Sequence, residues 1–185
     1  GKGLKALVLG AGPVGLLGAM LFIAAGFETY VYSRSQVPNA KADLVEAIGG
    51  TYISSETTAV EQLAGQIGAI DLVFEASGAP QLVFDVMRVS GTNAIFVLAG
   101  APEHTVLSEV DIAQVLLDRV GKNQVILGTV NAGRAAFEAA LRDLAIFKRR
   151  WPQALRSLIT GRYPIEQAPQ LLLGNMRGIK NIVTL

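Results

Sequence analysis

The stretch KALVLGAGPVG, residues 5–15, decides the fold, because it combines a buried strand, a G-x-G-x-x-G turn and the start of an apolar helix. Gly10 permits a tight turn after the strand, and Gly12 lets the backbone approach a pyrophosphate. Gly15 lets the helix lie close to the sheet. The glycine pattern alone is weak, but the strand before it and the helix after it favour a dinucleotide site over an incidental strand-turn-helix.

The helix that follows the turn begins with Pro13 and Val14. Proline suits the first helical position because it has no N–H to leave unpaired and its φ angle is already helical. The unpaired N–H groups and the macrodipole of a helix N-terminus favour negative charge. We therefore expect Pro13 and Val14 to border the bound pyrophosphate.

Strand-like apolar runs alternate with helical periods through the first two thirds of the chain. The expected strands are 4–9, 29–33, 51–53, 72–75, 94–98 and 125–128, and the expected helices are 14–25, 40–48, 60–67, 80–89 and 108–120. Nearly continuous apolar strands are typical of a sheet that is covered on both faces. The pattern predicts an α/β fold with a doubly wound parallel six-stranded sheet, the Rossmann fold.

The pattern changes after residue 128. The tail is expected to form helices over 135–150, 152–160 and 165–173 and a final strand over 179–185. It contains no second glycine-rich turn after a strand. We expect residues 1–132 to form a dinucleotide-binding domain, and residues 133–185 to form a helical extension that packs on the sheet or on another domain.

The end of the second strand indicates which cofactor binds. An acid at this position accepts from a ribose hydroxyl and repels a 2′-phosphate. Here the position holds Arg34, nineteen residues after Gly15, and a guanidinium can grip a phosphate with two hydrogen bonds. Ser33 and Ser35 add hydroxyl donors. The strand end therefore favours NADP over NAD, although dual use and a simple solvated arginine remain alternatives.

Small residues follow three further strands, where ligands of open parallel sheets bind. We assign cofactor contacts to Ala76, Ser77 and Gly78 after the fourth strand, to Ala99 and Gly100 after the fifth, and to Val130 and Asn131 after the sixth. Small side chains let a nicotinamide ribose approach the backbone, and Asn131 can hydrogen-bond near the carboxamide. Each loop taken alone could equally be an ordinary turn.

Composition limits the partners of the chain. Its 185 residues carry Lys+Arg 16 against Asp+Glu 15, so no strong field favours nucleic acid or a membrane surface. The charged fraction of 17% lies below the roughly 25% of an average domain, which suggests surface covered by a homo-oligomer or by a missing domain. There is no cysteine, which fits a cytoplasmic location. The chain begins at Gly1 rather than Met, so we expect a piece of a larger protein, with a processed small protein as the alternative.

Residues for proton chemistry are sparse. His104 is the single histidine, and its surroundings predict a solvated loop residue. Glu75 follows a strand, and we expect it to organise the loop after that strand. No His/Cys/Glu cluster has metal-ligand spacing. Hydride transfer also needs a group that polarises a carbonyl and moves a proton. We therefore predict no catalytic and no metal-binding residue in this chain.

The chain resembles the cofactor domain of zinc-dependent medium-chain dehydrogenases, in particular their glucose dehydrogenase branch. The resemblance rests on 10–15, 32–35, 41–49, 75–78, 128–131, 137–141 and the terminal segment from Trp151-Pro152 to Gly178-Ile179-Lys180. It implies sugar oxidation by a parent protein whose catalytic zinc and most of whose sugar contacts lie in a preceding domain. This chain is then expected to bind the nicotinamide dinucleotide without turning over substrate.

Three other functions fit parts of the sequence. One is the cofactor domain of another alcohol, polyol or quinone dehydrogenase of the same superfamily. The second is a regulatory module that senses NAD(P), and the third is a methyltransferase. Both of the latter normally carry an acid where this chain has Arg34.

Overall fold

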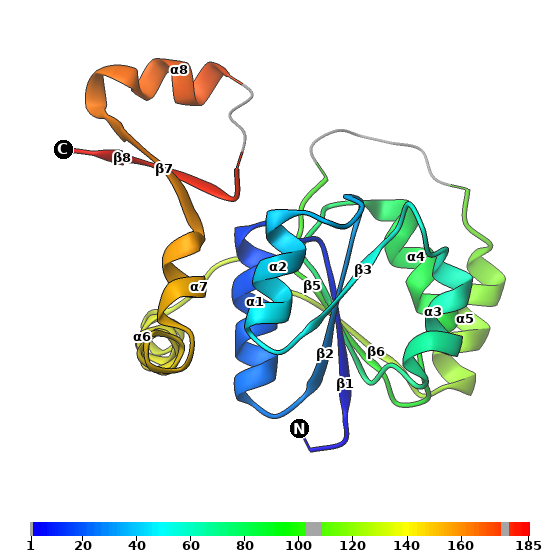
Figure 1. Cartoon of the computed structure of the whole chain (residues 1–185). Coiled ribbons are helices and arrows are strands. Elements are labelled where there is room, and N and C mark those ends of the chain that lie inside the picture. Colours follow the sequence, from blue (N-terminus) through cyan, green and yellow to red (C-terminus); the bar gives the residue numbers. More distant parts are fainter. Residues whose placement is uncertain (1, 103–108, 175–177) are drawn as a thin grey trace.

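Six parallel strands form the centre of the molecule in a computed structural model that describes residues 2–102, 109–174 and 178–185 (Figure 1). The strands are β1 (Lys5–Leu9), β2 (Glu28–Ser33), β3 (Thr51–Ser54), β4 (Leu72–Glu75), β5 (Ile95–Leu98) and β6 (Val125–Gly128). Their order is β3-β2-β1-β4-β5-β6, so the chain reverses direction across the sheet between β3 and β4. This is the doubly wound order, and the predicted fold class and all six strands are confirmed.

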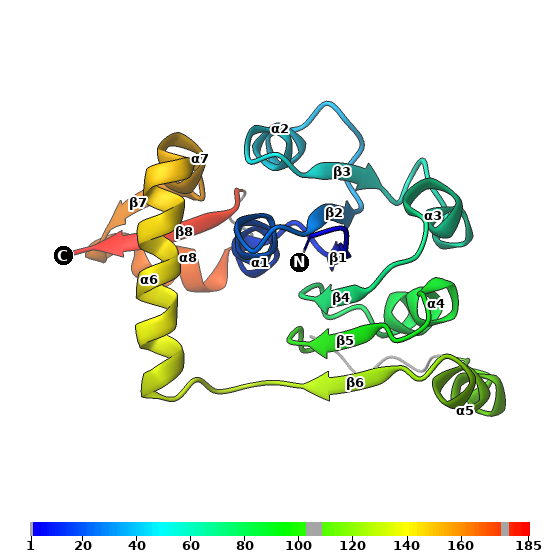
Figure 2. The same ribbon diagram turned by 90° about the horizontal axis from the view of Figure 1, so that it is seen from below.

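Helices cover both faces of the sheet (Figure 2). The helices α1 (Pro13–Ala24) and α2 (Ala40–Ala47) lie on one face, and α3 (Val60–Ile67), α4 (Pro80–Val89) and α5 (Ile112–Gly121) lie on the other. The first described turn of α5 begins later than predicted, because the Asp111 carboxylate accepts from the Gln114 N–H at 3.0 Å and fixes the helix start there.

The central strand β1 is buried on both faces, as its apolar sequence predicts. Val8 belongs to the core under α1 and α2, whereas Leu7 and Leu9 belong to the core under α3 and α4. Alternating side chains of one strand thus anchor both helical layers. The carboxyl end of β1, where the glycine turn begins, is held between them.

The tail packs on the sheet domain through the end of α6 and through the helix that follows it. The helices α6 (Arg134–Arg150) and α7 (Pro152–Ser157) contact α1 and α2. Phe147 of α6 is only 4% exposed and shares the core under α1, with the Trp151 ring 6.0 Å away. Phe137, nearer the start of α6, is 65% exposed. Ala154 of α7 and Leu158 after it are buried in the same core, so the last third of α6 and α7 together anchor the tail.

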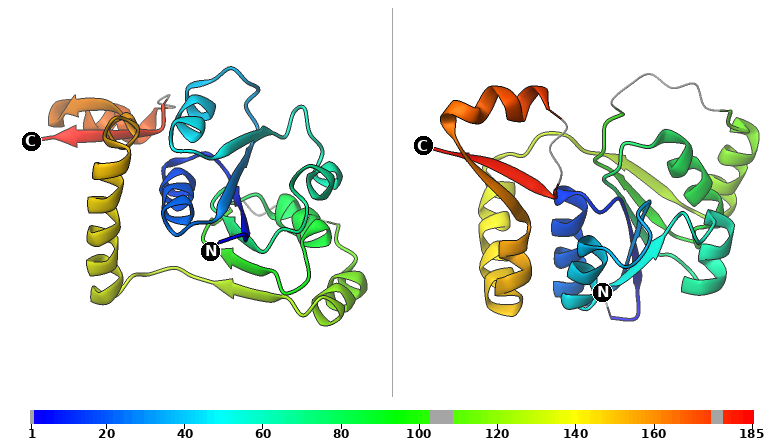
Figure 3. Two further views of the ribbon diagram at one scale, coloured as in Figure 1. Left: turned by 60° about the horizontal axis from the view of Figure 1, so that its bottom comes forward. Right: turned by 45° about the horizontal axis from the view of Figure 1, so that its top comes forward.

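The end of the tail forms a second, two-stranded parallel sheet that lies beyond α6 and α7 (Figure 3). It consists of β7 (Ile159–Pro164) and β8 (Lys180–Thr184), and the short helices η1 (Ile165–Gln167) and α8 (Ala168–Leu173) connect them. The predicted final strand and last helix are confirmed, but the predicted helix 152–160 is wrong after Ser157. Gly161 and Pro164 disfavour a helix, and the segment pairs with β8 instead.

Exposed apolar side chains gather at the free edge of the main sheet. The edge strand β6 exposes Val125, Ile126 and Leu127, and the neighbouring α5 exposes Leu117 and Val120. The low charged fraction predicts surface that a partner covers, and this apolar edge is one such candidate. Among the described residues, no helix is both long enough and apolar enough to cross a membrane.

Candidate nucleotide-binding site

A groove lies at the carboxyl ends of β1, β2 and β4. It brings together six of the predicted cofactor residues, Gly10, Gly12, Ser33, Arg34, Ala76 and Ser77, with Ala11, Tyr32, Lys41, Ser55, Ala79 and Leu82. The sheet order explains the location, because β1 lies between β2 and β4 and all three strands end at the same edge. This is the switch point at which open parallel sheets bind ligands.

The three glycines of the turn have three different local environments. Gly10 has a φ of +99°, which favours glycine, and its N–H donates to the Tyr32 carbonyl oxygen at 2.9 Å. A Cβ built on Gly15 would lie 2.0 Å from the Gly10 carbonyl oxygen, so the turn and α1 approach too closely for any side chain. A Cβ on Gly12 meets nothing within 4 Å. The fold itself therefore requires Gly10 and Gly15, and Gly12 borders open space.

No side chain in the described part of the chain caps the N-terminus of α1. Its N-cap residue, Gly12, has no side chain, Pro13 follows it, and the first turn holds no acid. The neighbouring α2 differs, since the Asn39 Oδ1 atom accepts from the N–H groups of Lys41 and Ala42 at 3.0 Å each. The first N–H groups of a helix lack partners within it, so the end of α1 can receive an oxyanion.

Two cations line the groove beside β2. Arg34 follows the strand and is exposed, and the Ser54 hydroxyl donates to its carbonyl oxygen at 3.1 Å. Lys41 lies in the first turn of α2 and lines the same groove. In the described ranges the ion pair present is Arg134–Glu138, so neither groove cation is neutralised by an acid there. Lys41 and Ser55 were not predicted from the sequence, although a cation seven residues after Arg34 at a helix start is a usable signal.

Tyr32 lines the groove, and its hydroxyl is engaged by the protein. Its hydroxyl donates to the Thr58 carbonyl oxygen at 2.7 Å, and its side chain is buried. Burial, with smaller effects of Glu61 and Asp85, raises the pKa of Tyr32 above its ordinary value. The residue therefore stays neutral and acts as a hydrogen-bonded wall.

The other predicted residues near the turn lie outside the groove. Pro13 and Val14 line an apolar cleft between α1 and the tail, whose other walls include Leu144 and Leu158. Ser35 has its backbone oxygen bound by the Tyr52 hydroxyl at 2.9 Å.

The loops after β4, β5 and β6 divide in the same way. Gly78 and Gly100 line a small pocket next to the groove. Ala99 donates its N–H to the Glu75 carbonyl oxygen at 2.9 Å. Val130 and Asn131 are exposed beyond β6 and do not line the groove.

Glu75 organises the loops, as its position predicts. It is 2% exposed, and its Oε1 atom accepts from the Ser77 N–H at 2.6 Å, the Ser77 hydroxyl at 2.8 Å and the Gly78 N–H at 2.7 Å. Its Oε2 atom accepts from the Gly100 N–H at 3.1 Å. Glu75 lines the small pocket beside the groove and not the groove itself, and its carboxylate oxygens are occupied by these donors.

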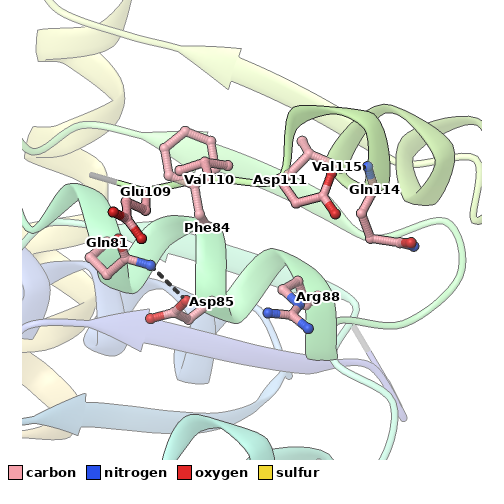
Figure 4. Close-up of a pocket in the computed structure, with 9 residues that line it drawn as sticks. All are labelled: Gln81, Phe84, Asp85, Arg88, Glu109, Val110, Asp111, Gln114 and Val115. Atoms are coloured by element: carbon pink, nitrogen blue, oxygen red, sulfur yellow. Dashed lines mark hydrogen bonds between the residues drawn. The ribbon is translucent and has the colours of Figure 1, made fainter. Parts of the chain in front are cut away.

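A separate cleft lies between α4 and α5 (Figure 4). It is lined by Gln81, Phe84, Asp85, Arg88, Glu109, Val110, Asp111, Gln114 and Val115. The Gln81 amide donates a hydrogen bond to the Asp85 carboxylate at 3.0 Å, so one of the three acids already has a partner. Three acids against one arginine disfavour a phosphate ligand, so this cleft is not a second nucleotide site.

The described part of the chain contains no group of three or more His, Cys, Asp or Glu residues that could hold a metal ion. His104 lies outside the described residues. The described residues therefore form a groove at the strand ends, and none of them form such a ligand group.

The family model for the C-terminus of glucose dehydrogenase matches residues 2–185. The chain belongs to this family. It is 36% identical over 180 residues to glucose 1-dehydrogenase 1 of Caldivirga maquilingensis, covering 97% of this chain and 49% of that protein. Glucose 1-dehydrogenase of Methanocella arvoryzae is 32% identical over 183 residues, covering 97% and 50%. The chain spans about half the length of the curated relatives it matches.

A solved structure extends the family likeness to three dimensions. Glucose dehydrogenase of Haloferax mediterranei, in complex with NADP, Zn and gluconolactone, superimposes with a TM-score of 0.84 at 27% identity. The match covers 98% of this chain and 51% of that one. The family and its fold, inferred from residue patterns, are thereby confirmed.

Proposed function

We propose that this chain is the NADP(H)-binding domain of a glucose or aldose dehydrogenase. The observation that carries the proposal is the groove itself, where the start of α1 and open space at Gly12 adjoin Arg34 and Lys41, two cations with no ion pair among the described residues. Both places suit an anion, and NADP has a pyrophosphate and a 2′-phosphate. The NADP-bound Haloferax neighbour supports the same assignment.

The order of the groove residues along the sheet edge sets the orientation of the bound cofactor. Arg34 and Lys41 mark the adenosine end beside β2, and the turn at Gly12 takes the pyrophosphate. The other half of the molecule then crosses β1 towards the loops after β4 and β5, where Ser77 and Gly100 lie. The bound cofactor accepts or supplies a hydride, and these residues hold and orient it. Val130 and Asn131 stay predicted contacts of the nicotinamide end.

The zinc and sugar chemistry belongs, in this proposal, to the half of the relatives that the chain does not span. The described residues do not fit a zinc site, because they bring no ligand group together. We therefore propose that the 185-residue chain binds NADPH but does not oxidise glucose on its own. Turnover of glucose by this chain with added zinc would contradict the proposal.

The test is a titration with NADPH and NADH by fluorescence. We expect NADPH to bind more tightly, and Arg34→Ala or Lys41→Ala to cost NADPH about 1.5–3 kcal/mol each, as for a charge-assisted hydrogen bond. NADH should lose much less. Arg142→Ala, which removes an exposed arginine of α6, is the matched control and should change neither affinity. Equal losses for both cofactors would refute the 2′-phosphate role.

The same proposal covers the remaining surfaces. We propose that residues 133–185 form an extension that packs on residues 1–132 and on the portion of the relatives absent from this chain, supported by the apolar cleft beside Val14 and by exposed Leu172 and Leu173. We also propose a homo-oligomer, supported by the apolar β6 edge. We also propose a cytoplasmic location, where a nicotinamide dinucleotide is available as cofactor.

A further inference from the structure

We propose that Glu75 is a positioning residue that fixes the nicotinamide half of the cofactor site by joining the loops after β4 and β5. The inference rests on the proposed function, since it concerns how that same groove is held in shape. Glu75 lies behind the groove and acts through the loop residues Ser77, Gly78 and Gly100.

The register of the sheet places these groups together. Glu75 is the last residue of β4 and lies opposite Leu9 of β1 and Leu98 of β5. Each of the three strands therefore ends in the same row, and the loops begin side by side. The Glu75 side chain leaves this row at its centre and can reach both the loop of its own strand and the loop of β5.

The two carboxylate oxygens divide the work. Oε1 accepts from the Ser77 N–H, the Ser77 hydroxyl and the Gly78 N–H, which folds the loop after β4 into a tight turn. Oε2 accepts from the Gly100 N–H at 3.1 Å, and the Glu75 backbone carbonyl oxygen accepts from the same N–H at 3.0 Å. The side-chain bond adds a second link between the loop of β5 and that turn. A carboxylate has four acceptor positions and no donor, which suits a centre surrounded by donors.

The two loops and the Glu75 side chain are closely packed against one another. A Cβ on Gly100 would lie 2.5 Å from Oε2 and 2.5 Å from the Gly78 nitrogen. A Cβ on Gly78, whose φ is +67°, would lie 2.4 Å from the Ala101 carbonyl oxygen. The turn at Ser77 in turn backs onto the glycine turn, because a Cβ on Gly10 would lie 3.1 Å from the Ser77 Cβ. Movement at Glu75 therefore reaches the groove through Ser77.

The substitution Glu75→Gln separates the two functions of the carboxylate. The amide oxygen can replace Oε1 and keep the turn, but the NH₂ group then faces the Gly100 N–H, and two donors cannot bond. The loop of β5 then loses its side-chain bond and keeps the bonds of the Ala99 and Gly100 N–H groups to the Glu75 backbone carbonyl oxygen, at 2.9 and 3.0 Å. The size of the side chain is unchanged. The adenosine end, on the other side of β1 beside Arg34, keeps its contacts.

The experiment compares NADPH with 2′,5′-ADP, which contains the adenosine bisphosphate end and lacks the nicotinamide half. Glu75→Gln should weaken NADPH by about tenfold and 2′,5′-ADP by less than about twofold. Asp71→Asn is the matched control, because Asp71 accepts from the Lys5 N–H at 2.7 Å at the opposite end of β4, and it should change neither ligand.

The outcomes are distinct. Equal weakening of both ligands, or no weakening of NADPH, overturns the role of Glu75. Failure of the unmodified chain to bind either ligand overturns the proposed function instead. Hydrogen exchange without ligand gives a second reading, in which Glu75→Gln should speed exchange of the Gly100 amide and Ser77→Ala should not. If Glu75→Gln does not fold, Ser77→Ala should still weaken NADPH more than 2′,5′-ADP, and an equal effect on both would overturn the proposal.

Discussion

Two single-methyl substitutions separate what the glycine turn does for the fold from what it does for a ligand. Gly12→Ala places a Cβ in open space, since nothing lies within 4 Å of it. Gly15→Ala places a Cβ 2.0 Å from the Gly10 carbonyl oxygen and 3.3 Å from the Val8 side chain. We predict that the first changes cofactor binding with little effect on stability, and that the second changes stability.

The magnitudes follow from these contacts. At Gly15 the turn and α1 must move apart by about 1 Å to admit the methyl group. Because the backbone itself must move, the loss of stability lies near the upper end of the about 1–3 kcal/mol that overpacking costs. Better helix propensity returns up to about 1 kcal/mol, which leaves a loss of about 2 kcal/mol and a fall in Tm of about 4–8 °C. At Gly12 the φ of −82° suits alanine. Alanine is a slightly poorer N-cap than glycine, but it lowers the conformational entropy of the unfolded chain, so the net change in stability is about 0.5 kcal/mol or less.

The assay is thermal unfolding of both variants followed by NADPH titration. We expect Gly12→Ala to unfold within about 2 °C of the unmodified chain. It should bind NADPH about tenfold or more weakly, because the methyl group occupies the path of the pyrophosphate. Full NADPH affinity in Gly12→Ala would refute the placement of the pyrophosphate. An unchanged Tm in Gly15→Ala would refute the close approach of α1 to the turn.

Three further predictions concern other parts of the chain. Phe147→Ala should cost about 3–5 kcal/mol of unfolding free energy in urea titrations, whereas exposed Phe137→Ala should stay within about 0.5, because only the end of α6 is anchored. Burial and then the hydrogen bond with Glu28 raise the pKa of Tyr30 to about 12, so the neutral form stabilises the fold up to pH 10 and this contribution is lost as the pH rises towards 12. The urea midpoint should fall less between pH 9 and 11 in Tyr30→Phe than in the unmodified chain, and equal falls would contradict this origin. Ile126→Lys on the β6 edge should convert an oligomer to monomer in sedimentation, and a chain that is monomeric before substitution would contradict the proposed association.

The fold of the sheet domain could be predicted because its signals are local. Each strand is a short apolar run, and burial on both faces makes that run continuous, as in β1. The tail strand β7 lacks such a run, since half-buried and exposed residues alternate in it and Gly161 and Pro164 lie within it. Its pairing partner, β8, lies about twenty residues further on. Local pattern therefore extended the preceding helix where long-range pairing makes a strand.

Some residues of the site could be predicted from local sequence, and others depend on the register of the sheet. The glycine turn and Arg34 were recognisable because each is defined within a few residues of a strand end. Lys41 and the reach of Glu75 to Gly100 depend on which strands are neighbours and which residues share a row. Since Leu9, Glu75 and Leu98 end their strands in one row, a carboxylate at its centre can brace both neighbouring loops. The register that places the groove at these strand ends thus also places Glu75 where, in our proposal, it supports cofactor binding without contacting the cofactor.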